Sequence, residues 1–496
     1  MSFSQLVSKV LTIEILHKIV IATNEHAIED RNWEVIPEYL DDTEIPHPKG
    51  IAIIKAYLFC LYWLSHSGKS IKEAWSNNFL LQEHPIKNLM KRNHFFAIHK
   101  HFRFVSRNDC YARNDSRYDP LGNIRSFVDE LLQNSQSLWI PGQILCIDEG
   151  RTVDKANSNI FSTSEPSKPI KCGRTTWYVC DKGKISVGIV VNLLMYTGKK
   201  TYTNLEESKT ANIVRQLVDI PLLRNSGRII IFDNYFTSPT VMNLLRKEFN
   251  LGAIGTIKVN RKHNSAYLQN CSYLKAQRNW EKGKYELWEL EIDDDISETL
   301  NINVWKDRKK TAVLFLDNCI PRSPPTVITR HEKYGENIQY TCPLVALAYN
   351  LANFFVDVAN QREANLHATP RTRRKNMRLG HEMIIRLAII NCIIYWIEWK
   401  QEKFSAKKLF TELLADWTQE YFNQRESDYF RYEMNNKIKA AGFHPQIAGE
   451  HLCISTGNSR RCINCKIRTV YACAQCKIYD EAIYLCNPKK YSSYVA

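Results

Sequence analysis

The stretch RIIIFDNYFTS, residues 228–238, decides how the rest of the chain is interpreted. Ile229 to Phe232 form a continuous apolar run, which is typical of a β-strand buried on both faces. The run leads directly into Asp233, although burying an unpaired carboxylate costs free energy. Two interpretations are open for this residue. Asp233 either caps the turn or helix that follows, as Asp often does, or binds a cation that offsets its charge.

Composition and charge indicate a folded, basic protein. Of its 496 residues, 44% are hydrophobic and 11% aromatic, which is enough for a packed core and excludes a disordered chain. The length predicts about two to four domains. The formal net charge of +15 favours a polyanionic partner, of which nucleic acid is the most common.

The most apolar stretches, residues 50–68 and 383–399, are predicted to be core helices. Each contains an internal charge, Lys55 or Arg386, and each falls short of a membrane span of about 20 residues. The N-terminus lacks the apolar core and the cleavage site of a secretory signal. We therefore expect an intracellular protein with no membrane contact, whose 15 cysteines are reduced thiols or metal ligands rather than disulfides.

The order of the predicted elements describes an α/β core with a mixed sheet. A strand begins after Pro141-Gly142 and reaches Asp148, and residues 175–200 contain a β-hairpin that turns at DKGK. A helix, the strand that ends at Asp233, another helix and another strand follow. The predicted divisions are an N-terminal helical region, 1–140; the first part of the core, 141–261; a β-rich insertion, 262–340; the second part of the core with its following helices, 341–445; and a cysteine-rich domain, 446–496.

Two acids are expected on buried strands of one sheet, and a third lies in an apolar helical run; periodicity alone does not place the three together. Asp148 and Asp233 each end a predicted strand, and Asp357 lies in the apolar helical run NFFVDVANQ. Carboxylates drawn together would repel each other unless a cation neutralised them, and oxygen ligands suit Mg²⁺ or Mn²⁺. Two such ions can activate the attacking oxygen and stabilise the leaving oxygen of a phosphoryl transfer. Taken singly, each acid is equally compatible with a cap or a salt bridge.

The ordered motifs resemble the piggyBac transposase family. They are ILCIDEG at 144–150, KPIKCGR at 168–174, YVCD at 178–181, YTGK at 196–199, IIIFDNYFTS at 229–238, and YN seven residues before VD at 356–357. The resemblance covers residues 30 to 494. It implies an RNase H-like catalytic domain in which Asp148, Asp233 and Asp357 bind two divalent ions. It further implies a nuclear homodimer that cuts double-stranded DNA at transposon ends and joins it to TTAA targets.

This chain departs from the family in the third motif. The family pattern is Lys-Gly-Gly-Val-Asp-x-x-Asp, and here Asn353, Phe354 and Phe355 replace the lysine and both glycines. Asp357 is kept, whereas Asn360, a neutral oxygen ligand at best, replaces the last acid. Two functions follow: a transposase or domesticated derivative that still cleaves DNA, or a catalytically silent protein that binds DNA or chromatin.

Two further segments predict ligand contacts. The spacing of two C-x-x-C pairs predicts a zinc site, with unliganded thiols or a RING-like ubiquitin ligase as alternatives. Its candidate ligands are Cys462, Cys465, Cys473, Cys476 and Cys486. The run RTRRKNMR follows the third acid and predicts contacts to DNA phosphates, with a solvated connector as the alternative. Its basic residues are Arg371, Arg373, Arg374, Lys375 and Arg378.

Overall fold

The computed structural model divides the protein into two compact units, Met1–Gln419 and Glu420–Ala496, and each is described by itself. The described residues are 1–31, 34–40, 44–78, 83–153, 161–258, 277–291, 299–307, 312–440, 453–461, 468–478 and 481–484. Within these ranges, residues 167, 169, 205, 323, 332–334, 336, 371, 373 and 375 are excepted.

The N-terminal region is helical, as the sequence predicts. In the mixed basic and aromatic stretch around residue 95, Phe95, Phe102 and Phe104 are buried, whereas the exposed charged side chains are those of Lys91, Arg92 and Lys100. The aromatic residues therefore belong to the core. The helices are α1 (Phe3–Val7), α2 (Ile13–Arg31), α3 (Pro48–Ser67), α4 (Ile71–Ala74), α5 (His84–Leu89), α6 (Arg92–His101), the 3₁₀ turn η1 (Arg107–Asp109) and α7 (Arg125–Gln136).

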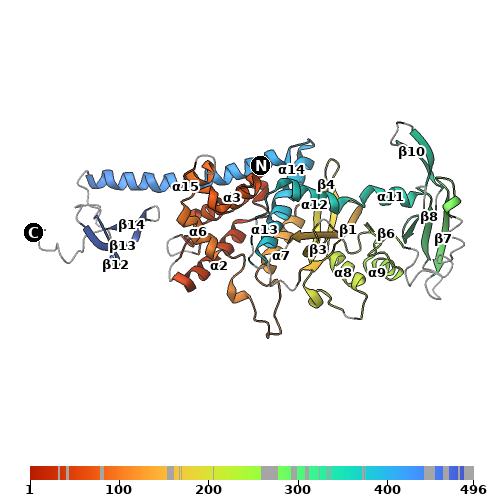
Figure 1. Ribbon diagram of the computed structural model, residues 1–496, viewed down its shortest axis with the longest axis horizontal. Coiled ribbons are helices and arrows are strands. Elements are labelled where there is room, and N and C mark those ends of the chain that lie inside the picture. The colour runs from red at the N-terminus through yellow and green to blue at the C-terminus, as the bar shows by residue number, and fades with distance from the viewer. Residues whose placement is uncertain are drawn as a thin grey trace, which may run out of the picture. The chain divides into compact units, whose positions relative to one another are not determined.

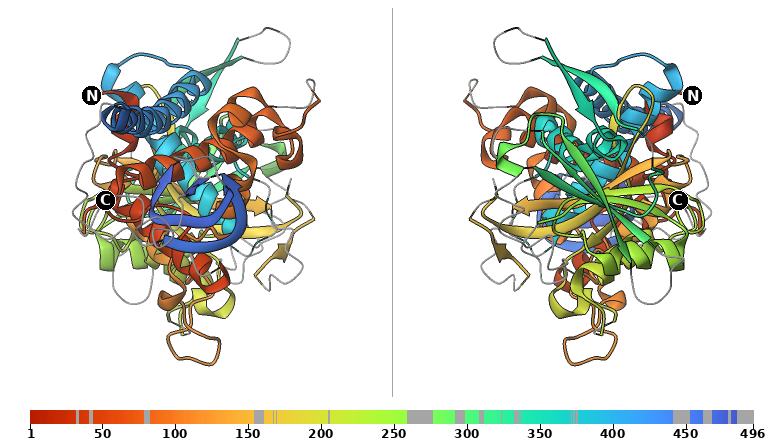
Figure 2. Two further views of the ribbon diagram at one scale, coloured as in Figure 1. Left: turned by 90° about the vertical axis from the view of Figure 1, so that its left-hand side faces the viewer. Right: turned by 90° about the vertical axis from the view of Figure 1, so that its right-hand side faces the viewer.

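A nine-stranded mixed sheet forms the centre of the first unit. Its order is β2-β3-β1-β5-β6-β9-β8-β7, with β4 paired to β3, and β1, β5 and β6 run parallel. The predicted hairpin is present as β3 and β4. Figure 2 shows the twist of the sheet, since the green strands lie across the direction of the yellow ones. The strands β1 to β6 are Ile144–Val153, Thr163–Ser164, Cys172–Lys182, Val187–Met195, Ile229–Phe232 and Gly252–Thr256.

The segment predicted to be a β-rich insertion continues this central sheet. Its strand β9 (Val313–Asp317) pairs antiparallel with β6, and β8 (Thr299–Trp305) and β7 (Tyr285–Glu291) follow outward. Only β10 (Thr326–His331) and β11 (Asn337–Cys342) form a separate ribbon among the described strands of this segment. Residues 262–276 of the predicted insertion lie outside the described residues.

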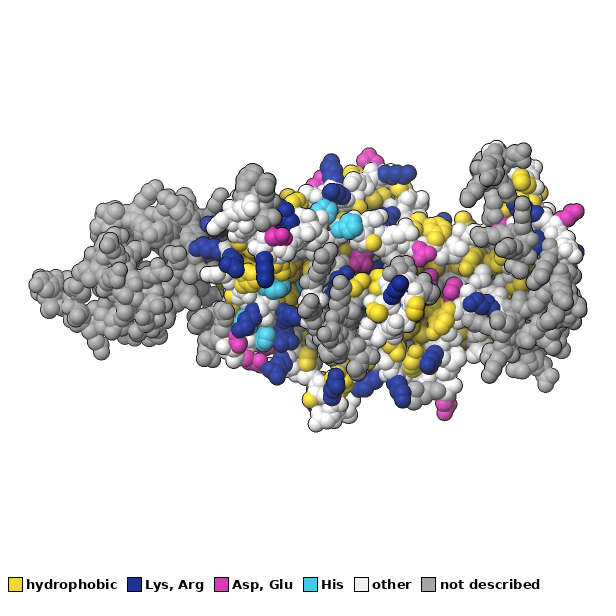
Figure 3. Space-filling model, viewed as in Figure 1, with side chains coloured by type: hydrophobic (Ala, Val, Ile, Leu, Met, Phe, Trp, Pro, Cys, Tyr) yellow, Lys and Arg dark blue, Asp and Glu magenta, His cyan; other side chains and the backbone are white. Residues whose placement is uncertain are grey.

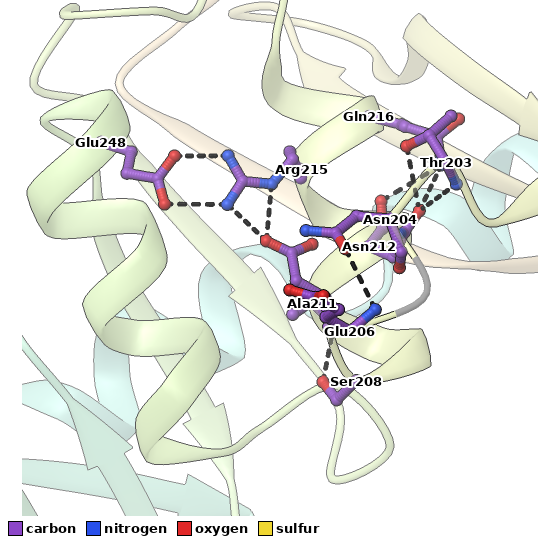
Figure 4. Close-up of polar contacts among 10 residues, drawn as sticks. Thr203, Asn204, Glu206, Ser208, Ala211, Asn212, Arg215, Gln216 and Glu248 are labelled. Carbon is purple, nitrogen blue, oxygen red and sulfur yellow. Dashed lines mark hydrogen bonds and ion pairs between the residues drawn. The ribbon is translucent and has the colours of Figure 1, made fainter.

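Helices cover both faces of the sheet (Figure 1). On one face α8 (Lys209–Val218) and α9 (Pro239–Phe249) pack against the buried core that contains Leu145, Ile147 and Phe232. Figure 4 shows how Arg215 of α8 joins the two helices, because its guanidinium pairs with Glu248 of α9. The opposite face of the sheet is covered by α11 (Leu344–Ala352) and α12 (Phe355–Leu366).

The apolar stretch near residue 390 is a core helix, as predicted. It is built from α13 (Met377–Met383), a π-helical segment η4 (Ile384–Ile390) and α14 (Asn391–Lys400). By length and composition this helix could cross a membrane, yet 94% of its most apolar stretch is buried inside the protein. The long helix α15 (Ala406–Ala440) follows it.

Asn391 forms hydrogen bonds with the backbone of the edge strand β4. Its Oδ1 accepts a hydrogen bond from the Val190 N–H at 3.0 Å, and its Nδ2 donates to the Val190 carbonyl at 2.9 Å and to Ser135 Oγ at 2.9 Å. Edge strands present unpaired backbone groups, and a buried edge needs partners for them. One fully buried amide therefore attaches the core helix to both the sheet and α7.

We expect Asn391→Leu to lower the free energy of unfolding by roughly 2–5 kcal/mol, because it leaves two buried backbone groups of Val190 without partners. Urea unfolding of the full chain measures the change. Asn93→Leu, at an exposed position of α6, is the matched control and should be nearly neutral. Equal stabilities of the Asn391 variant and the control would show that the backbone groups of Val190 do not depend on Asn391 for hydrogen-bond partners.

Candidate active site

The pairing of β1 with β5 sets Asp148 beside Asp233. The two strands are parallel, and Ile147 lies opposite Phe232. The next residue in each case is the acid, so Asp148 and Asp233 lie at neighbouring positions. Asp233 follows the end of β5, whereas Asp148 lies inside β1, which continues to Val153 in its pairing with β3; the prediction that the first strand ends at Asp148 is therefore wrong. Adjacent strands are about 4.8 Å apart. Both acids are half-buried. The structure thus brings together two of the three acids that the sequence predicts.

The pair is electrostatically strained. Burial, with contributions from Glu149 and Asp233, raises the pKa of Asp148 to about 8. Burial also raises the pKa of Asp233, and the charge of Glu149 adds to this effect. A carboxyl whose pKa is raised by burial and by like charges is poised to gain from a cation.

Asp233 also has a local structural role. One of its carboxylate oxygens accepts a hydrogen bond from the Tyr235 N–H at 2.8 Å, and its carbonyl accepts one from Thr237 Oγ1 at 2.7 Å. The cap of α9 is Ser238, whose hydroxyl accepts from the Val241 N–H. Asp233 therefore stabilises the turn after β5 but does not cap the following helix.

Asp357 lies in the first turn of α12, next to the pair but not joined to it. Its side chain is exposed. Burial, together with the negative charges of Asp148 and Asp357, raises the pKa of the Cys146 thiol on β1, so both acids lie near this thiol. Among the residues that the structure describes, however, no three His, Cys, Asp or Glu side chains are close enough to hold a metal ion.

Asn360, which stands where the family has its last acid, bonds to a residue of the protein core. Asn360 Oδ1 accepts a hydrogen bond at 3.0 Å from Arg386, a buried side chain of η4. The same guanidinium nitrogen donates to Glu363 at 2.7 Å. Asn360 therefore faces the core arginine, and the prediction that it could serve as a metal ligand has no support from this geometry.

Two charged residues near Asp148 were not singled out from the sequence. Glu149 donates its backbone N–H to Asp148 Oδ1 at 2.7 Å, and its carboxylate pairs with Lys168. Hydrogen bonds with Asp148 and Lys168 outweigh burial and lower the pKa of Glu149. Both residues lie in motifs that the sequence analysis quoted, Glu149 in ILCIDEG and Lys168 in KPIKCGR. Nothing in the sequence, however, shows that Lys168 pairs with Glu149 from 19 residues away.

The basic connector is only partly described. Arg371, Arg373 and Lys375 lie outside the described residues, and Arg378 is half-buried in the first turn of α13. Arg374 donates to the backbone carbonyls of His99 at 2.9 Å and Phe102 at 2.6 Å, so its guanidinium ties the connector to the end of α6 instead of pointing toward solvent. Figure 3 shows other Lys and Arg side chains gathered over the region of α2 and α6.

The predicted zinc ligands fall in the second unit. Cys473 and Cys476 belong to β13 (Arg468–Ile478), which pairs with β12 (Cys453–Arg461) and β14 (Glu481–Tyr484). The backbone register sets Cys453 opposite Cys473. Cys462, Cys465 and Cys486 lie outside the described residues, so the zinc site stays a prediction.

The two paired acids, together with Asp357, fit a divalent cation in part. Asp148 and Asp233 supply oxygen ligands that adjacent strands force together, which is the chemistry that Mg²⁺ and Mn²⁺ prefer. Asp357 is the third candidate ligand, and its side chain would have to turn from solvent toward the pair.

Comparison with known proteins agrees with these observations. A family model described as Transposase IS4 matches residues 2–393. Among solved structures, the chain is similar to the piggyBac transposase in its synaptic complex with hairpin DNA, with a TM-score of 0.66 and 21% sequence identity over 97% of this chain and 94% of that one. A search of curated proteins found no match. At this identity the structural likeness shows the fold, and the family model shows the relationship: the chain belongs to the IS4/piggyBac-type transposase family.

Proposed function

We propose that this protein is a piggyBac-like transposase, or a domesticated derivative of one, that cleaves and joins double-stranded DNA. The register that sets Asp148 beside Asp233 in a mixed sheet is the observation that supports this function most. In this proposal the core is RNase H-like, and Asp148, Asp233 and Asp357 hold Mg²⁺ or Mn²⁺. When bound, such ions stabilise the attacking and leaving oxygens of a phosphoryl transfer.

The chain's own residues would prepare the site for DNA. Asp148 and Asp233 would hold the ion as carboxylate ligands. The ion would displace the proton that burial favours on Asp148, and its positive charge would offset the repulsion between the two carboxylates. Lys168 pairs with Glu149 and offsets one of the negative charges that a DNA phosphate would meet. The exposed Asp357, in the first turn of a helix that packs on β1, can turn toward the pair without unfolding the helix.

The wider proposal extends to targets, partners and location. We include transposon ends and TTAA sequences as substrates, a homodimer as the working form, and the nucleus as the place of action. Arg371, Arg373 and Lys375 are proposed phosphate contacts, whereas Arg374 is assigned to the protein interior. These statements rest on the family to which the chain belongs.

A second function has specific support. The exposed Asp357 and the bond between Asn360 and Arg386 leave the described site with two assembled acids instead of three or four. A protein with this geometry that had lost catalysis would still bind DNA through its basic surface. The alternative is therefore a catalytically silent DNA- or chromatin-binding protein.

Asp233→Asn separates the two functions. In the transposase, we expect the change to reduce cleavage of a TTAA-flanked DNA end at least a hundredfold, because it removes a metal ligand, while DNA affinity stays equal or rises slightly. Asp219→Asn is the matched control and should cleave normally, because Asp219 is an exposed acid that pairs with Arg224 outside the candidate active site. Cleavage with Mg²⁺ and DNA binding are measured on the same samples. Indistinguishable cleavage by wild type and Asp233→Asn, with DNA binding intact, would establish the silent function.

The cysteine-rich unit provides a test of its own. We expect the purified full chain to contain zinc, and Cys473→Ser combined with Cys476→Ser to lose it, because four thiolates complete one tetrahedral site. Elemental analysis by mass spectrometry measures the content. Cys172→Ser, which changes an exposed free cysteine of the first unit, should leave the zinc content unchanged. Wild-type protein that contains no zinc would rule out the site.

A further inference from the structure

Arg386 is a buried cation that joins three elements. It is 3% exposed and lies in the π-helical segment η4. Its Nε donates to Glu382 at 3.2 Å, and its Nη2 donates to both Asn360 and Glu363, which belong to α12. The guanidinium also lies 4.7 Å from the centroid of the Tyr178 ring on β3. Only the planar fork of an arginine can make these contacts at once.

The helix that Arg386 holds packs closely against two glycines of the sheet. A Cβ added to Gly150 of β1 would lie 2.7 Å from Asn360 Oδ1 and 2.6 Å from the Tyr178 ring. A Cβ added to Gly188 of β4 would lie 2.9 Å from the backbone nitrogen of Ala359. The contact at Gly188 is with the backbone of α12, so this glycine limits the depth at which the helix packs. At Gly150 a Cβ would require the Asn360 amide or the Tyr178 ring to shift.

Asn360 and Asp357 are coupled through the geometry of α12. Residues three apart lie within one turn of a helix, so a contact that fixes α12 at Asn360 also fixes where the backbone of Asp357 lies. The neutral amide also suits its place, since Arg386 already has two carboxylate partners, Glu363 and Glu382. Asn360 provides an acceptor for the guanidinium without a third buried negative charge.

We propose that Arg386 is a positioning residue, which holds α12 on the sheet through Asn360 and Glu363 and thereby sets the place of the acid Asp357. The π-helical segment in which Arg386 lies is of the kind that is common at functional sites. The inference rests on the proposed function, because it assigns Asp357 to a metal site with Asp148 and Asp233.

The test measures Mn²⁺ affinity of the metal-free full chain by calorimetry, without DNA. Asn360→Ala breaks the link to Arg386 but keeps both ion pairs of the arginine, so the fold should survive. Loss of such a supporting contact typically weakens metal binding about tenfold or more, and we expect this result. Gly150→Ala keeps every hydrogen-bonding group but its methyl would displace the Asn360 amide or the Tyr178 ring that Arg386 contacts, and it should weaken Mn²⁺ binding in the same direction.

Thr369→Val is the matched control. It removes the hydrogen bond of 2.7 Å from Thr369 Oγ1 to Glu363 beyond the end of α12 and leaves the contact between Arg386 and Asn360 intact. It should bind Mn²⁺ like the wild type even where its melting temperature falls as far as that of Asn360→Ala. Wild-type affinity in both Asn360→Ala and Gly150→Ala, or weakened binding that follows melting temperature in all three variants, would overturn the positioning role.

The same titration keeps this inference separate from the proposed function. Mn²⁺ binding by the wild type that Asp233→Asn abolishes supports the metal site, and the variants above then decide the role of Arg386. Binding that is absent in the wild type, or unchanged in Asp233→Asn, would instead remove the metal site on which both proposals depend.

Discussion

The parallel pairing of β1 with β5 is the constraint on which the rest of the site depends. It fixes Ile147 opposite Phe232, and the two residues that follow are both acids. Their apolar predecessors are buried against α8 and α9, so neither strand can slip without exposing the core. The sheet thus keeps two carboxylates close together that would separate if they were free. The stability of the core offsets the electrostatic repulsion between the two carboxylates. A bound cation would reduce this repulsion.

The face above these acids is where this chain differs from its family pattern. The family's two glycines are replaced by Phe354, which is exposed, and Phe355, which is fully buried. On the side of the sheet, α12 packs closely against Gly188, and the Asn360 side chain packs against Gly150. Arg386 then supplies a buried charge that bonds the helix directly. A changed third motif is therefore compatible with a well-packed helix, although it leaves Asp357 at the surface.

Much of the fold followed from local patterns in the sequence. The hairpin of β3 and β4, the strand that ends at Asp233 and the buried helix around residue 390 were predicted correctly because each has a strong apolar pattern bounded by turn residues. The attachment of β9 to β6 was not predicted, since strand pairing is a non-local property that periodicity does not encode.

The site was predicted less completely than the fold, for physical reasons. Asp148 and Asp233 could be assigned to strands of one sheet because each follows a short apolar run, although β1 continues past Asp148 to Val153. The direction of the Asp357 side chain depends on how α12 packs. Arg374 belongs to a run of basic residues, yet it binds two backbone carbonyls of the N-terminal helices, which only tertiary structure reveals. Arg386 was noticed as a charge in an apolar run, but its partners lie 23 and 26 residues away.

The central claim is that the fold forces Asp148 and Asp233 together so that a divalent cation must displace a proton to bind. Calorimetric titration of the metal-free protein with Mn²⁺ at pH 7, in two buffers of different ionisation enthalpy, measures the protons released. Because the pKa of Asp148 is raised to about 8, its carboxyl is still protonated at pH 7, and we expect about one proton to be released for each site filled. Asp148→Asn should remove this release. Mn²⁺ binding without any release of protons, or with the same release in wild type and Asp148→Asn, would contradict the account.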